Sequence, residues 1–199
     1  MPLIRLFRLA MLATTASSAL SGCVTTSQFP HVEPAAAVAD ARLSGTWLLS
    51  KGTERTWLHI GPGSPQGQSL LVVHQDTRPD REQGGMGGRI LTAPAGKDPV
   101  ASVALDWEFG EDGAPKAADK AQWLLLRYRL DGQSLQIERL DDDATGKAVQ
   151  AGELLGQYQA TGDGKHPAAP QLQTPTPKLA AWLASGKAKW HQWGVWTRR

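Results

Sequence analysis

The sequence predicts a mainly β protein, an antiparallel small β-barrel of about eight strands with one C-terminal helix. From residue 43 onward, short segments of alternating hydrophobicity are separated by clusters of Gly, Pro and Asp. These segments recur at a spacing of roughly 8 to 15 residues, which is typical of all-β domains. A barrel is favoured over a sandwich because closure leaves no strand edge exposed.

The first 22 residues have the pattern of a signal peptide. Arg5 and Arg8 precede an uncharged run from Leu9 to Leu20, and small residues follow that run. The run is shorter than the roughly 20 apolar residues that a spanning helix needs. We therefore expect residues 1–22 to be removed, the alternatives being a core helix or an anchor that stays attached.

The only cysteine of the chain closes this segment, in Leu20-Ser21-Gly22-Cys23. These four residues resemble the lipobox of bacterial lipoproteins. The resemblance implies that the Cys23 thiol receives a diacylglyceryl group, that a peptidase cuts before Cys23, and that the new amino group is acylated. It also implies a lipid-anchored protein of the cell envelope. By the same resemblance, Val24 after the cysteine points to the outer membrane. The domain is expected to face the periplasmic side, and the leaflet that holds the anchor stays open.

Cleavage would leave 177 of the 199 residues, divided into two parts. Residues 23–42 are rich in Ala, Thr and Pro and lack a period of two, so they predict a lipidated N-terminus and a flexible tether. Residues 43–199 are expected to form a single barrel domain. Without Arg5 and Arg8, 19 Lys and Arg balance 19 Asp and Glu, which argues against a nucleic-acid partner.

Two stretches give the clearest strand signals. In VASVALDWEFG, one face is predicted to be dry and made of Ala101, Val103, Leu105, Trp107 and Phe109. Asp131-Gly132 predicts a hairpin turn between two apolar arms. The inward residues of those arms are expected to be Leu124, Leu126, Tyr128, Leu130, Leu135 and Ile137.

The remaining elements follow from similar patterns. Further strands are predicted at LSGTWLLS, RTWLHI, SLLVVHQ, RILT, the segment around LLGQYQAT, and KWHQWGVWTRR. A helix is predicted in TPTPKLAAWLASG, with Thr176 as its cap, Pro177 in its first turn and Gly186 at its exit. Leu179, Trp182 and Leu183 form its apolar stripe.

Gly45-Thr46-Trp47 resembles the G-x-W motif in the first strand of lipocalins, and the late helix followed by a strand and an arginine resembles that family as well. The resemblance implies a lipocalin-like barrel with Trp47 packed across its base. It also implies an interior that could carry a small apolar ligand or a lipid.

Aromatic residues predict how that interior is filled. We expect several of Trp47, Trp57, Trp107, Trp123 and Tyr128 to point inward and to leave the interior largely packed. Binding would then occur at the loops or on a C-terminal aromatic surface for a glycan or acyl chain. That surface would consist of Trp182, Trp190, Trp193 and Trp196; the alternative is that these residues plug the barrel and dock the helix. The last three share a strand face only if Gly194 marks a bulge.

Other candidate sites have plainer explanations. His59 and His74 lie in adjacent strands but lack a third metal ligand at a diagnostic spacing. Asp141 to Gly146 matches the start of an EF-hand loop, but Gly152 occupies the twelfth position and a solvated turn explains the run. The glycine-rich stretches GPGSPQG and GGMGG are expected to be loops, the second a mobile lid or partner loop.

The sequence therefore predicts a lipid-anchored envelope protein with a non-catalytic binding or partner role. No motif for a catalytic nucleophile, a metalloprotease or a cofactor is present, so neither an enzyme nor a bound cofactor is expected. The predicted partners are the membrane, through Cys23, and an envelope protein, glycan or lipid. The alternative role is a carrier that holds a small apolar ligand inside the barrel.

Overall fold

Eight antiparallel strands close into a barrel in the structure, a computed structural model that describes residues 24–63, 67–76, 84–95, 97–109, 115–117, 122–158 and 169–199. This confirms the predicted fold class. In barrel order the strands are β2 (Gly45–Lys51), β3 (Glu54–Pro62), β4 (Gln68–Asp76), β5 (Gly84–Ala95), β6 (Asp98–Phe109), β8 (Trp123–Asp131), β9 (Ser134–Leu140) and β12 (Trp190–Arg198).

The barrel closes through its last strand. Each of the first seven strands pairs with the next one, and β12 returns between β9 and β2, with Arg198 opposite Trp47. A short strand, β7 (Pro115–Ala117), pairs only with the end of β6. The predicted hairpin at Asp131-Gly132 is confirmed, because Asp131 lies opposite Ser134 across a two-residue turn.

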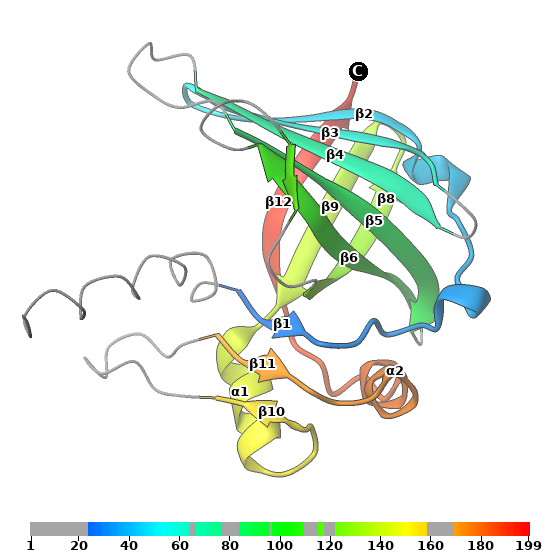
Figure 1. Ribbon diagram of the computed structural model, residues 1–199, viewed down its shortest axis with the longest axis vertical. Helices are drawn as coiled ribbons and strands as arrows, with labels where there is room; N and C mark the ends of the chain where they lie inside the picture. Colours follow the sequence, from blue (N-terminus) through cyan, green and yellow to red (C-terminus); the bar gives the residue numbers. More distant parts are fainter. Residues whose placement is uncertain are drawn as a thin grey trace, which may run out of the picture.

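A second layer, which we call the outer layer, covers one side of the barrel from outside (Figure 1). It contains β1 (Thr26–Ser27), α1 (Asp142–Gln150), β10 (Gly156–Gln157), β11 (Gln171–Leu172) and α2 (Thr176–Ala184). Its apolar side chains pack against Val100, Leu125 and Leu140 on the outer face of β6, β8 and β9. The part of the barrel wall formed by β6, β8 and β9 therefore has apolar residues on both its inner and its outer face.

The predicted C-terminal helix is confirmed as α2, and Leu179, Trp182 and Leu183 on it are buried. Its first turn differs in detail from the prediction. Thr176 is the first helical residue, and its hydroxyl donates a hydrogen bond to the Pro30 carbonyl at 2.9 Å instead of capping the helix. Within the described ranges, no helix is long and apolar enough to cross a membrane.

The acidic run at residues 141–143 begins a helix, not the predicted solvated turn. Asp141 caps α1, and its carboxylate accepts a hydrogen bond from the Ala144 amide at 2.8 Å. Asp142 and Asp143 lie in the first turn, where carboxylates favour the positive end of the helix dipole. The strand predicted around LLGQYQAT is reduced to the two residues of β10 within the described part of that segment.

The segment predicted to be a flexible tether is packed on the barrel from residue 24 onward. Thr26 pairs with Leu124 of β8 and with Gln171 of β11, and Thr25, Ser27 and His31 are buried. Two short 3₁₀ turns follow, η1 (Pro34–Ala36) and η2 (Ala41–Leu43). The prediction was wrong here because these residues are held by partners that are distant in the sequence. No local sequence pattern indicates such partners.

Candidate functional site

The barrel encloses an apolar cavity of about 330 Å³. Its walls come mainly from the inward-facing residues of β3, β4, β6 and β8, whose side chains alternate between the lumen and the outer face. Leu58 and Ile60 on β3 and Leu124 and Leu126 on β8 are examples. The described residues that line the cavity include no Asp, Glu, Lys or Arg.

Leu43 lines one end of the cavity, and Trp47 packs in the core beside it. This side chain is 0% exposed, and its indole N–H donates a hydrogen bond to the Leu43 carbonyl at 2.8 Å. The Arg198 guanidinium lies 4.4 Å from the centre of the Trp47 ring and donates hydrogen bonds to the carbonyls of Ser44 and Arg42. Trp47 is therefore a core residue at the end of the barrel where Leu43 lies.

A polar pair supports the same end. The buried Tyr128 hydroxyl donates a hydrogen bond to Asp40 Oδ2 at 3.0 Å. Burial raises the pKa of Tyr128, so the hydroxyl remains a donor at neutral pH. The hydrogen bond from Arg42 is the main cause of a lowered pKa for Asp40, which keeps the carboxylate an acceptor.

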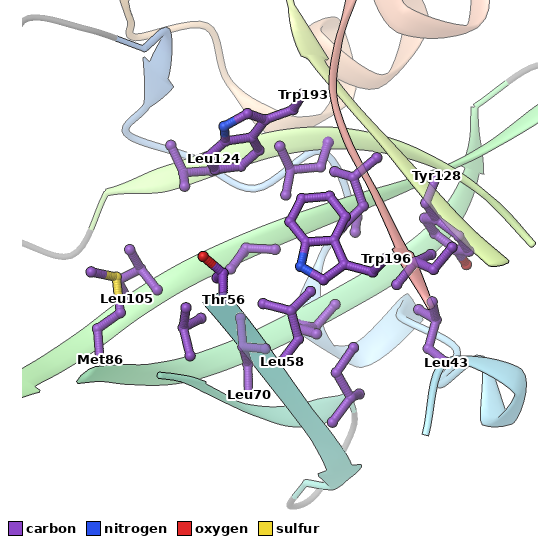
Figure 2. A pocket seen from close by; sticks show the side chains of 18 of the residues that line it. Leu43, Thr56, Leu58, Leu70, Met86, Leu105, Leu124, Tyr128, Trp193 and Trp196 are labelled. Atoms are coloured by element: carbon purple, nitrogen blue, oxygen red, sulfur yellow. The ribbon is translucent and has the colours of Figure 1, made fainter. Parts of the chain in front are cut away.

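The lining becomes more exposed toward the opposite end, which we call the mouth. Its residues are Thr56, Met86, Leu105, Leu124 and Trp193, which Figure 2 labels, and His74. His74 is exposed and Trp193 is 46% exposed, whereas Leu43 at the closed end is only 3% exposed. Thr56 Oγ1 and His74 Nδ1 lie 3.3 Å apart on neighbouring strands of this rim.

A bulge in β12 brings two tryptophans to the cavity. Gln192 pairs with Glu138 and Gly194 pairs with Ile137, so Trp193 is an extra residue between these two pairs. The bulge allows both Trp193 and Trp196 to line the lumen. A Cβ on Gly194 would lie 2.7 Å from the Trp196 ring, so glycine is needed at this position.

A second irregularity turns Trp107 out of the barrel. Gly88 pairs with Leu105 and Gly87 pairs with Trp107, which leaves Asp106 as the extra residue of β6. Ala101, Val103 and Leu105 line the lumen as predicted, but the alternation reverses before Trp107. The Trp107 ring covers Gly87, where a Cβ would lie 2.2 Å from it. GGMGG is therefore part of β5, not a loop.

The predicted packed interior is wrong, because most of the large aromatics lie elsewhere. Trp47 and Tyr128 are part of the inner core. Trp57 stacks on the exposed His59, with ring centres 6.5 Å apart. Trp123 is buried outside the lumen, in a cluster with Val32 and its neighbours. The lumen is lined mainly by aliphatic residues and keeps its cavity.

The four tryptophans of the predicted C-terminal surface lie in two places. Trp193 and Trp196 line the cavity. Trp182, on α2, and Trp190, at the start of β12, pack in the apolar cluster outside the barrel. There the Trp182 indole donates a hydrogen bond to Glu153, and Arg127 lies over the Trp190 ring. The structure therefore separates these side chains instead of bringing them together as one surface.

The structure also places the residues considered for metal binding. His74 faces the lumen, whereas His59 faces outward and bonds Thr46, so the two side chains point to opposite faces of the wall. Asp142 accepts hydrogen bonds from Thr25 and Arg139. The described residues contain no group of three or more His, Cys, Asp or Glu that could hold a metal ion. Cys23 and the signal segment lie outside the described residues.

Comparison of the chain with protein-family models, with curated proteins and with solved structures gave no significant match.

Proposed function

We propose that the protein is a non-catalytic binding protein that holds a small apolar ligand inside its barrel. The observation that carries this proposal is the lumen, which is lined mainly by aliphatic side chains and ends at the buried Leu43. Apolar cavities of this kind bury a ligand by removing hydrocarbon surface from water. The cavity favours the carrier role over binding on an outer aromatic surface.

The cavity volume limits the size of the ligand. An engineered apolar cavity of about 150 Å³ accommodates benzene, so 330 Å³ corresponds to roughly a dozen non-hydrogen atoms. This lies at the small end of the range of roughly 300 to 1,000 Å³ that is usual for ligand pockets. A medium-length hydrocarbon chain or a compact ring system meets this limit, whereas a whole two-chain phospholipid does not.

A pair of adjacent valines on β4 provides a matched test. Val72 lines the lumen, and Val73 is half-buried on the outer face of the same strand. We expect Val72→Trp to fill the cavity and to weaken binding of isopropylnaphthalene, an uncharged probe of suitable size, at least tenfold. Val73→Trp should change the affinity less than twofold. Equilibrium dialysis with fluorescence detection of the probe measures both.

Two controls make this comparison decisive. Circular dichroism establishes that each variant keeps the sheet spectrum, and Val72→Phe offers a smaller filling residue if tryptophan prevents folding. Equal affinities of the two tryptophan variants, or no binding of the probe to the unchanged protein, would contradict a ligand site in the lumen.

We further propose that the protein is anchored to the envelope membrane by acyl chains on Cys23. The lipobox-like residues Leu20 to Cys23 support this proposal. Thr26 pairs with Leu124, which belongs to the mouth, and the Thr25 amide donates to Asp142 at 2.9 Å. An anchor on Cys23 would thus join the barrel without a long spacer, on the side of its mouth. Two or more acyl chains suffice for stable anchoring.

Metabolic labelling tests the anchor directly. In a bacterial host given a labelled fatty acid, the wild-type protein is expected to carry the label and to fractionate with membranes. Cys23→Ala should abolish both properties, because the thioether cannot form. Cys23→Ser serves as a second variant of similar size. Label retained by either variant, or a wild-type mass without acyl chains, would refute this proposal.

A further inference from the structure

The indole nitrogen of Trp196 is a buried hydrogen-bond donor without a protein partner. The side chain is 5% exposed and lines the cavity, and Nε1 makes no hydrogen bond. The buried indoles of Trp47 and Trp182 differ, because they donate to the Leu43 carbonyl and to Glu153. Buried donors in native proteins nearly always have partners, so Nε1 of Trp196 indicates that an acceptor enters the lumen.

Trp196 places this donor away from the exposed mouth, because its side chain is 5% exposed whereas Trp193 on the same strand is 46% exposed. Trp196 lies opposite Leu135 on β9, a residue that is 1% exposed and lies close to the β8–β9 hairpin at the closed end. Figure 2 shows its indole reaching from β12 in among the lining side chains, with the nitrogen on the edge toward Leu58. A group that meets Nε1 has therefore passed the mouth and left water.

The other polar side chains of the lining are already paired or lie at the rim. The Tyr128 hydroxyl donates to Asp40, and Thr56 lies beside His74 at the mouth. Among the described lining residues, Trp196 is thus the buried donor that has no protein partner. The donor is neutral, and the lining includes no Lys or Arg that could balance a negative charge.

A charged group at this depth would lose its hydration without gaining a counter-ion, which is strongly unfavourable. An uncharged oxygen acceptor loses much less hydration and gains the indole N–H. We propose that the ligand is an apolar molecule with one uncharged carbonyl-type oxygen, as in a ketone, an ester or an aldehyde, which accepts a hydrogen bond from Trp196 Nε1. This inference rests on the proposed function and assigns the ligand class of that site.

Three naphthalenes test this assignment, because they share ring and size and differ at one substituent. An acetyl group supplies a neutral acceptor, an isopropyl group supplies none, and a carboxylate supplies a charged one. In equilibrium dialysis, Trp196→Phe keeps an aromatic ring but removes the N–H. We expect this change to reduce the preference for acetyl over isopropyl, the ratio of the two dissociation constants, by roughly three- to tenfold.

Trp193→Phe is the matched control, because Trp193 lies on the same strand and lines the same cavity but is 46% exposed at the mouth. It should leave the preference unchanged within about twofold. The isopropyl compound makes no hydrogen bond, so its change in dissociation constant between wild type and Trp196→Phe gives the effect of the smaller ring alone, which the ratio of the two constants removes. The carboxylate should bind at least tenfold more weakly than the acetyl compound at neutral pH.

A measurement on the wild-type protein keeps the test valid if Trp196→Phe does not fold. In a ¹H–¹⁵N correlation spectrum, the signal of the Trp196 indole proton should shift downfield when the acetyl compound binds. The shift should be smaller with the isopropyl compound. If isopropylnaphthalene binds but neither the preference nor the indole signal depends on the acceptor, this inference is overturned and the proposed function stands. Failure of all three probes to bind overturns both. Equal binding of the carboxylate overturns the uncharged ligand class.

Discussion

Replacement of Trp47 by alanine is expected to lower the free energy of unfolding by about 3–5 kcal/mol, the usual cost of truncating a large buried aromatic. Trp47 is 0% exposed and packs in the inner core. Its loss would open a cavity at the base, leave the Leu43 carbonyl without its indole donor, and remove the ring under Arg198. Urea unfolding of a soluble form that begins at residue 24, followed by circular dichroism, measures the change.

Trp193→Ala is the control for this prediction. It removes the same kind of side chain from the same barrel, but at the exposed mouth, so we expect a loss below about 1 kcal/mol. Trp47→Phe should lie between the two, because it keeps an aromatic ring and loses the hydrogen bond to Leu43. Similar losses for Trp47→Ala and Trp193→Ala would show that the closed end does not depend on Trp47.

Hydrophobic alternation was sufficient to locate the eight barrel strands and to predict much of the barrel's inner face. Leu124, Leu126 and Tyr128 on β8 line the lumen as the period of two requires, and Leu135 and Ile137 do so on β9. Trp107 does not follow the period of two, because one extra residue, Asp106, reverses the alternation on β6. A bulge of this kind depends on pairing with the neighbouring strand, which a single strand's pattern does not contain.

The cavity could not be predicted for a related reason. Its volume is the small difference between the space that eight strands enclose and the side chains that fill it. Turning Trp57, Trp107 and Trp123 outward removes three large rings from that space. A bulge at Gly194 was only a condition for the tryptophans to share a strand face. The bulge at Trp193, which brings two indoles to the lumen, required the register with β9.

The outer layer shows where local patterns were least informative. Thr26 and Gln28 donate backbone hydrogen bonds to the carbonyls of Pro170 and Leu172, at 3.1 and 2.8 Å. Backbone pairing of this kind leaves no trace in side-chain periodicity, so the segment before residue 43 was predicted to be a tether. The helix α1 was missed because Thr145 and Gly146, both poor helix formers, lie inside it.

The outer layer also contains the residue that should make stability most sensitive to acid. His31 is 2% exposed, and its Nδ1 lies 2.7 Å from the Ser102 hydroxyl oxygen on the outer face of β6. The same oxygen accepts a hydrogen bond from the His31 amide at 2.9 Å. Burial lowers the pKa of His31 to about 4, although the backbone of Ala93 opposes the shift in part.

The direction of the pH effect follows from comparing the two states. In the unfolded chain, histidine has a pKa near 6.5, so between about pH 6.5 and pH 4 the unfolded state binds more protons than the folded state. The free energy of unfolding should therefore be unaffected by His31 above this window and should fall as the pH drops through it. The expected loss attributable to His31 is about 3 kcal/mol between pH 7 and pH 4.

His31→Gln isolates this contribution, because glutamine is polar and does not titrate. The variant loses contacts with Ser102 and is expected to be less stable than wild type at pH 7. As the pH falls to 4, the wild type should lose about 3 kcal/mol more than the variant, so their unfolding free energies converge or cross. His191→Gln, at an exposed position on β12, controls for the removal of a histidine. Parallel curves for wild type and His31→Gln from pH 7 to pH 4 would mean that His31 accepts its proton in the folded protein without disturbing the segment that covers β6.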